Sequence, residues 1–340
     1  MTDLSATSAE SRGTAHFRMV RVVQQLGFEL DPDHELDPGH DVRFNFTGPR
    51  PVVVHFTRDD HDPNAAVCAA TCVAEIEDTI RTKLASPLKD DIAALGSLSP
   101  SELSAIDNIL TDLGTLLRST IQLFRWRNGL VYGGNIAVEN AQAFYSGDGK
   151  SWLKVSLVRG IELGVPMAFK KSLKDVPPEE IVRMVESGDQ EPVAHQLFRE
   201  AFELRYSYPR SALAIGIAAA EIGVKDLIAS LIPNARWLVM ETSSPPVVKI
   251  LREYLPMLPV RARFKDKTLK PPSELITLIK KGIEYRNGLV HAGASLPELK
   301  ELESILHAVN DVLWVCELYA GAEWAGKYIS ANTKMLWPKE

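Results

Sequence analysis

Cysteine is scarce in this chain of 340 residues, and charge of neither sign dominates it. Three cysteines cannot build a disulfide framework, and their odd number favours a reducing compartment. The chain holds 38 Lys and Arg against 44 Asp and Glu, which excludes a basic coat over the whole protein. With 45% hydrophobic residues it has enough apolar surface for real cores, and its length suits two domains.

Long hydrophobic runs are also missing. The run of small apolar residues at 212–220 is followed by Glu221, and it is much shorter than the roughly 20 residues of a membrane span. Residues 1–13 are polar and small, without the apolar segment of a secretory signal. We therefore expect a cytoplasmic protein that does not enter a membrane.

Several common catalytic motifs are absent as well. The sequence has no Walker loop, no Gly-x-Gly-x-x-Gly fingerprint and no Gly-x-Ser-x-Gly elbow, which argues against a nucleotide-driven motor, a Rossmann enzyme and a serine hydrolase. Cys68 and Cys72 are four residues apart, with His55 and His61 upstream, but the second ligand pair of a zinc site is missing. We interpret the cysteines as core residues and expect neither metal nor cofactor.

The two halves of the chain differ in charge and pattern. Residues 1–190 hold 19 basic and 27 acidic residues, whereas residues 191–340 hold 19 and 17. The first half mixes strand and helix patterns, so we expect an α+β domain over 1–160. Its predicted elements are a hairpin of strands 42–46 and 51–56, a helix at 64–84, a helix opened by the capping box Ser99–Glu102, and strands near 141–145 and 152–157.

The second half has helical spacing of apolar residues almost throughout. A linker is expected at 161–191, with a short helix near 179–186, and an all-α bundle at 192–322, followed by a tail at 323–340. The predicted bundle helices are 192–206, 210–232, 245–255, 273–292 and 296–320, the last opened by a capping box at Ser295–Glu298. Short polar connections between helices of this length favour an antiparallel bundle.

The run Tyr285-Arg286-Asn287-Gly288-Leu289-Val290-His291 closes one of these predicted helices. At about 100° per residue, Asn287 and His291 lie one turn apart on the same face, and Arg286 lies about 140° from His291. Arginine matches phosphate oxygens, and histidine transfers protons near neutral pH. Such a set suits metal-free RNA cleavage, in which the 2′-hydroxyl attacks its own phosphate. The alternative is that Arg286 caps the helix and His291 is an ordinary helix-terminal histidine.

Arg-Asn-x-x-x-His at a helix end resembles the signature of the HEPN superfamily, in which four to six residues separate Arg from His. The segment 208–221, rich in small residues, is similar to the bundle helix that precedes this motif in many HEPN proteins. The likeness covers roughly 192–322. It implies a metal-independent endoribonuclease of toxin–antitoxin, antiviral-defence or RNA-processing type, and a homodimer whose two motifs face one cleft. It also implies that Arg286 contacts phosphate, His291 transfers protons and Asn287 assists.

Two further features accompany the motif. Glu221 interrupts an apolar helix, where it is expected either to orient Arg286 or His291 or to pair with Lys225 one turn away. Residues 261–270 carry five cations around Phe264, which suits an RNA backbone with a stacked base, although a solvated loop has the same composition. The cations proposed to bind RNA are Arg261, Arg263, Lys265, Lys267 and Lys270.

The pentapeptide Arg-Asn-Gly-Leu-Val occurs a second time, at 127–131, with Tyr132 where His291 stands. Tyrosine, with a pKa of about 10, is a poor proton shuttle at neutral pH. We therefore favour a helix end whose Trp126 and Arg127 pack at a domain boundary, over a decayed copy of the motif.

The sequence thus predicts an endoribonuclease that acts on RNA through Arg286 and His291 and dimerises through its bundle. The first domain is expected to restrain or direct this activity, or to bind a regulatory partner. HEPN-like domains that have lost activity serve as dimerisation or ligand-binding modules. The competing prediction is therefore a non-catalytic module that dimerises or binds a ligand or nucleotide.

Overall fold

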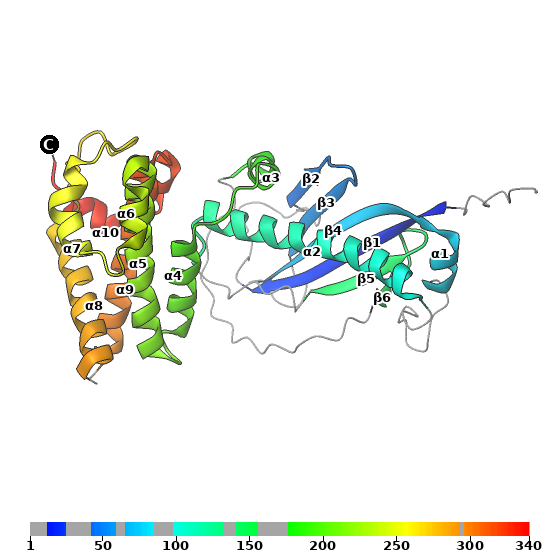
Figure 1. Ribbon diagram of the computed structural model, residues 1–340, viewed down its shortest axis with the longest axis horizontal. Helices are drawn as coiled ribbons and strands as arrows, with labels where there is room; N and C mark the ends of the chain where they lie inside the picture. Colours follow the sequence, from blue (N-terminus) through cyan, green and yellow to red (C-terminus); the bar gives the residue numbers. More distant parts are fainter. Residues whose placement is uncertain are drawn as a thin grey trace, which may run out of the picture. The chain divides into compact units, whose positions relative to one another are not determined.

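The computed structural model describes residues 12–24, 42–58, 65–84, 98–131, 141–155, 176–292 and 296–339 (Figure 1). The chain forms two compact units, Met1–Gln190 and Glu191–Glu340. The first contains an antiparallel sheet and helices, and the second is mostly helical, as the sequence predicts for the two halves. No described helix combines the length and apolar composition that crossing a bilayer requires.

The sheet of the first unit has six described strands in the order β2-β3-β4-β1-β5-β6, and each neighbouring pair is antiparallel. The strands are β1 (Arg12–Gln24), β2 (Val42–Phe46), β3 (Val52–Arg58), β4 (Ala65–Glu77), β5 (Gln142–Ser146) and β6 (Leu153–Val155). The predicted hairpin is confirmed as β2–β3, and the predicted pair of strands near 141–157 as β5–β6.

One long helix, α2 (Pro100–Arg127), lies along one face of this sheet (Figure 1). Its predicted capping box is confirmed: the Ser99 hydroxyl accepts from the backbone of Glu102, and the Glu102 carboxylate accepts from the backbone of Ser99. The short helices α1 (Asp78–Leu84) and α3 (Pro178–Glu186) contribute Ile80, Ile181 and Met184 to the same core. The short helix expected at 179–186 is therefore present, and it packs with the first unit.

Two strands were not foreseen. Residues 65–77 form strand β4, so the predicted helix over 64–84 is wrong except for its last seven residues, which form α1. Alanine favours a helix, but the buried residues Cys68, Ala70, Cys72 and Ala74 alternate with period two, and strands pair on both sides of β4. Strand β1 likewise buries every second residue from Ala15 to Met19.

The second unit is built around α5 (Pro209–Leu231), which contacts α4, α8 and α9. Glycines on α5 permit this close packing, since a Cβ at Gly216 would lie 2.6 Å from Leu306 Cδ2 and one at Gly223 2.5 Å from Leu313 Cδ2. The helices of this unit are α4 (Val193–Leu204), α5, α6 (Arg236–Glu241), α7 (Val247–Lys249), α8 (Ser273–Ala292), α9 (Leu299–Ala320) and α10 (Ala331–Leu336), with short irregular turns at 233–235, 250–257 and 323–327.

The helical predictions are confirmed for α4, α5, α8 and most of α9. The second capping box is wrong: α9 begins at Leu299 with Glu298 as its N-cap, and Ser295 lies outside the described residues. Over 245–255 the chain forms a single turn of α-helix followed by a π turn. The segment expected as a tail folds back on α9, where Ser330 and Thr333 bond Asp311.

Candidate functional site

The motif residues occupy the last two turns of α8, whose backbone stays helical through His291 and ends at Ala292. Arg286 is partly buried, with 22% of its side chain exposed, and Asn287 is exposed. The side chain of His291 lies outside the described residues, so its placement relative to Arg286 stays a prediction. Both residues nevertheless belong to one continuous helix, on which they are five positions apart.

Glu221 of α5 and Arg286 of α8 form an ion pair between Oε1 and Nη2. Arg286 is thus the partner of Glu221, one of the partners that the sequence offers beside Lys225. Gly282, one turn before Arg286, brings the two helices together, because a Cβ there would lie 2.7 Å from Ile217 Cδ1 on α5 and from Ile305 Cγ2 on α9. A glutamate directly after the apolar run 212–220 is therefore explained by a cation on the neighbouring helix.

The same carboxylate has a second described partner. Ser244, in the connection after α6, donates its hydroxyl to Glu221 Oε1 over 3.3 Å. Only 15% of the Glu221 side chain is exposed, so its charge is largely removed from water and needs both donors. The pair fixes the position of a permanent cation at a partly open surface, an arrangement suited to holding an anion.

A second polar cluster adjoins the motif and was not singled out from sequence. The Tyr285 hydroxyl donates to Glu301 Oε2 over 2.8 Å, and Lys281 Nζ donates to Glu301 Oε1 over 3.0 Å. The hydrogen bond to Glu301 raises the pKa of Tyr285, because it favours the neutral phenol. Lys281 and Tyr285 are four residues apart on α8, a spacing that marks them in retrospect as one face.

The structure does not bring the basic segment 261–270 to the motif. The segment precedes α8, and Arg286 lies 13 residues beyond the first residue of that helix, Ser273, which is about 20 Å along the axis. Arg261 donates to the carbonyl groups of Ala320 and Ser230, and Lys267 donates to that of Trp337. Both cations therefore fasten backbone at the opposite end of α8 from the motif.

Phe264 packs edge-on against Trp337, with ring centroids 5.5 Å apart, so this ring is held by the C-terminal segment instead of being offered to a base. Of the five cations, Lys267 is partly buried, and the exposed ones are Arg261, Arg263, Lys265 and Lys270.

The Arg-Asn-Gly-Leu-Val run at 127–131 is a packing element, as favoured from the sequence. Arg127 is 5% exposed and pairs with Glu180 of α3, its Nε 3.1 Å from Glu180 Oε1. Asn128 caps the end of α2, and Gly129 takes a φ of 60°, a left-handed conformation that favours glycine. Tyr132 lies outside the described residues.

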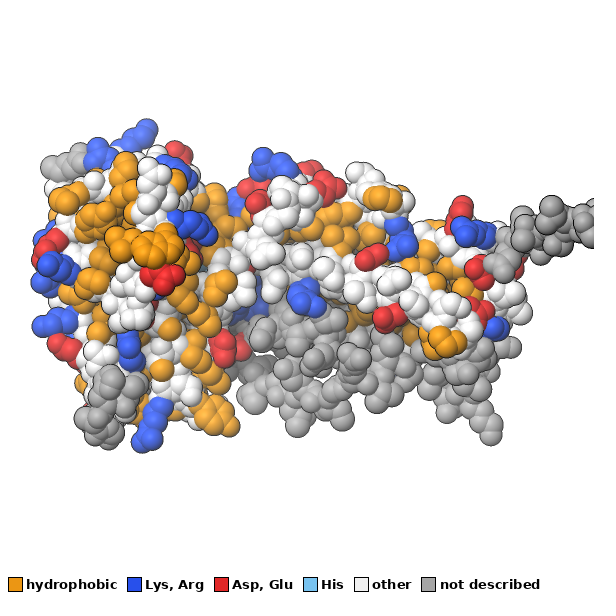
Figure 2. Space-filling view, viewed as in Figure 1, with side chains coloured by type: hydrophobic (Ala, Val, Ile, Leu, Met, Phe, Trp, Pro, Cys, Tyr) orange, Lys and Arg blue, Asp and Glu red, His pale blue; other side chains and the backbone are white. Residues whose placement is uncertain are grey.

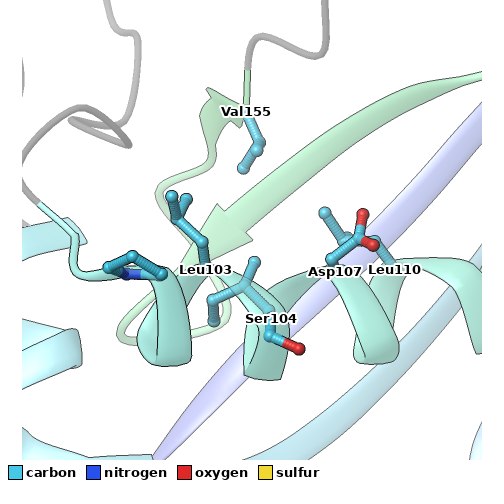
Figure 3. Close-up of a pocket in the computed structure, with 7 residues that line it drawn as sticks. Leu103, Ser104, Asp107, Leu110 and Val155 are labelled. Carbon is cyan, nitrogen blue, oxygen red and sulfur yellow. The ribbon is translucent and has the colours of Figure 1, made fainter.

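The first unit carries a shallow hollow of about 320 Å³ between the start of α2 and strand β6 (Figure 3). It is lined by Pro100, Leu103, Ser104, Ile106, Asp107, Leu110 and Val155. Among these described lining residues Asp107 alone is ionisable, and none of the predicted site residues belongs to them. The hollow therefore supplies no chemistry for the predicted reaction.

The cysteines are core residues, as interpreted from sequence: Cys68 and Cys72 are buried on β4, and Cys316 is buried on α9. Within the described ranges, no group of three His, Cys, Asp or Glu side chains is placed as metal ligands would be. Comparisons of the chain with models of protein families, with curated proteins and with solved structures found no match.

Proposed function

We propose that this protein is a metal-independent endoribonuclease of the HEPN type, acting in defence or as a toxin, with Arg286 and His291 as its catalytic residues. The observation that supports the proposal is the run Arg286-Asn287-x-x-x-His291 on the last two turns of α8, in a helical unit where Glu221 holds the arginine. A partly exposed cation held by a neighbouring helix is preorganised for a phosphate.

The proposed reaction needs no group beyond the chain and the RNA. The 2′-oxygen attacks the adjacent phosphorus while its proton passes to a base, the bond from phosphorus to the 5′-oxygen breaks, and the leaving 5′-oxygen takes up a proton. His291 transfers protons in this exchange, and Arg286 stabilises the charge on the phosphoryl oxygens. Asn287, exposed beside Arg286, orients the ribose or phosphate. Glu221 acts through Arg286 as a positioning residue.

The test is cleavage of labelled single-stranded RNA in EDTA by the wild type, Arg286→Ala and His291→Ala. We expect both variants to lose at least 100-fold in rate, and the wild-type product to end in a 2′,3′-cyclic phosphate. Lys280→Ala is the matched control, because Lys280 is an exposed cation on the same helix, 57% exposed. Equal cleavage by wild type, Arg286→Ala and His291→Ala contradicts the site.

One observation supports the competing function, a non-catalytic module that dimerises or binds a ligand. Helix α6 buries none of its six residues, and three of them are large apolar side chains: Trp237 is 74% exposed, Leu238 65% and Met240 48%. Figure 2 shows hydrophobic side chains gathered on the helical unit near α6. Large exposed apolar side chains on one short helix are typical of a contact surface. A protein that dimerises but leaves RNA intact under all conditions favours this function.

A further inference from the structure

We propose that the sheet face of the first unit that lies opposite α2 binds single-stranded RNA. This binding site is separate from the motif on α8. Under this proposal the first unit binds the RNA that the second unit cleaves. The proposal rests on three observations: which residues share this face, how charge is distributed between the two faces, and how Arg18 lies on Trp152.

The strand registers identify the residues that share the face. Alternate residues of each strand point to opposite sides of a sheet, and one set packs under α2 in the core. The other set covers the opposite face. It includes one row across all six strands, in which each residue is paired with a residue of the neighbouring strand. This row is Asn45, Val53, Thr71, Arg18, Phe144 and Lys154.

The described helices of the first unit all lie on the other side. Helices α1, α2 and α3 place their buried side chains in the core beneath α2. On the opposite face, Val53 is 38% exposed and Val73 is 47% exposed, although both are apolar. No described helix places its buried side chains on this face, but Ala69 there is only 2% exposed and the turn at Gly149 lies against His16. The exposed part of the face, around Val53 and Val73, is what it offers to a partner.

Three cations lie on this face. The row and its neighbours carry Arg18, Arg43 and Lys154, and the acids of this face, Glu75 and Glu77, lie together at one end of β4. The outer side of α2 exposes the acids Asp107 and Asp112, the second of which pairs with Arg50, and α3 on the same side exposes Arg183. A unit whose sequence is acidic overall thus presents a local cationic surface, which is complementary to a phosphate backbone.

Flat groups lie among these cations. The guanidinium carbon of Arg18 lies 4.2 Å from the centre of the Trp152 ring, and Arg18 Nε donates to Thr71 Oγ1 over 3.3 Å. These two contacts hold a planar, half-buried cation at the centre of the face. Phe144 is paired with Arg18 in register on the next strand. Bases stack on aromatic rings and on guanidinium planes alike, so this centre suits unpaired bases.

The same features favour RNA over an acidic peptide and a single strand over a duplex. An acidic peptide needs the cations but gains little from flat aromatic and guanidinium surfaces, whereas a nucleic acid uses both. A duplex hides the faces of its bases, so it reaches the cations alone. The histidines of this face, His16 and His55, extend the surface along β1 and β3.

The experiment measures binding of a fluorescein-labelled single-stranded RNA of mixed sequence to the full chain by fluorescence anisotropy at 50 mM salt. All proteins carry His291→Ala, so the strand is not cut under the proposed function. We expect Lys154→Glu and Arg43→Glu each to raise the Kd about tenfold and to reduce the salt slope by about 0.7 for each phosphate that is no longer neutralised. Trp152→Ala should raise the Kd about fivefold to 100-fold.

Arg183→Glu is the matched control, because Arg183 is an exposed cation of α3 in the same unit but on the other side of the sheet. It should leave the Kd within about twofold of that of the parent protein. The charge reversals at Lys154 and Arg43 lie at exposed positions, so they decide the question even if Trp152→Ala fails to fold.

Three results overturn the proposal: no RNA binding by the parent protein, equal binding by the parent and both charge reversals, or equal affinity for the duplex of the same sequence. Arg286→Ala in the same assay separates this face from the motif, since its effect should add to that of Lys154→Glu if the sites are independent. Failure of the cleavage experiment leaves this binding result unaffected.

Discussion

Glu221 on α5 binds Arg286 on α8, and this ion pair joins two helices through residues that are 65 positions apart in sequence. Side chains on a helix lean toward its N-terminus, so a long arginine near the end of α8 reaches back along its own helix toward its partner. The pair explains why a carboxylate directly follows the run of small apolar residues at 212–220. It also places the cation of the motif in a fixed position at a partly open surface.

If this pair positions Arg286 for catalysis, Glu221→Ala should lower the rate of RNA cleavage by about 100-fold, since small errors of position cost that much. Glu221→Gln, which keeps an oxygen acceptor, should recover part of that loss. Lys225→Ala is the control, because Lys225 lies one turn away on the same helix. Single-turnover rates check the prediction, and a Glu221→Ala protein with the wild-type rate contradicts a positioning role.

Arg127 and Glu180 make the corresponding pair in the first unit, where the arginine is almost fully buried. Glu180→Ala leaves this cation without its carboxylate, and it should lower the free energy of unfolding by about 2–4 kcal/mol. Glu179→Ala removes a neighbouring exposed acid from the same helix turn and should cost under about 0.5 kcal/mol. Urea unfolding followed by fluorescence measures both, and equal effects of the two variants count against the pair.

The two copies of Arg-Asn-Gly-Leu-Val show where local sequence stops determining structure. In the copy at 127–131, α2 ends and Gly129 takes a positive φ, whereas in the copy at 286–290 α8 continues through Gly288 to Ala292. Five identical residues thus adopt two backbone conformations. The difference comes from the tertiary surroundings, which no short motif contains, and this is why the sequence left open whether Glu221 pairs with Arg286, His291 or Lys225.

Periodicity predicted the long helices well because their apolar faces repeat over several turns, and α8 has the predicted bounds. It failed for β4, whose small residues have high helix propensity but lie between two partner strands. The length of α8 separates the segment 261–270 from the motif, and RNA binding by the cations of this segment stays a prediction.

The capping box at the start of α2 makes the stability of the first unit depend on pH. The pKa of Glu102 is lowered to about 2, chiefly by the hydrogen bond from Lys83 and by those from Ser99. A carboxylate whose pKa is lower in the folded protein stabilises it above the unfolded pKa of about 4.3, and that stability is lost as the pH falls from there toward 2.

Glu102→Gln should therefore be less stable than the wild type at pH 7, and the difference should shrink as the pH approaches 2. Glutamine still accepts the backbone hydrogen bond, so the variant tests the charge and not the cap. Asp107→Asn, at an exposed acid of the same helix, controls for the loss of one negative charge. Urea midpoints between pH 7 and 2.5 measure the effect, and a difference that does not vary with pH argues against it.

Asp311 anchors the C-terminal segment on α9. This buried carboxylate accepts hydrogen bonds from the backbone of Ser330 over 2.8 Å, from its hydroxyl over 2.7 Å, and from the Thr333 hydroxyl over 2.6 Å. Since Ser330 is also the N-cap of α10, the three bonds fix both the position and the start of that helix. Trp337 follows it and packs against Phe264, so the anchor also orders the segment that precedes α8.

Asp311→Ala should lower the free energy of unfolding of the second unit by about 2–4 kcal/mol, because it strands buried donors that were bound to a charge. Thr333→Val removes one of the three bonds and should cost about 1 kcal/mol. Ser304→Ala, at an exposed serine on α9 whose hydroxyl donates to Lys300, is the control. Hydrogen–deuterium exchange distinguishes an anchor from a general core residue: amides of 325–337 and 264–268 should exchange faster in Asp311→Ala, while those of α5 keep their protection. Uniformly faster exchange across the unit contradicts the anchoring role and makes Asp311 an ordinary part of the core.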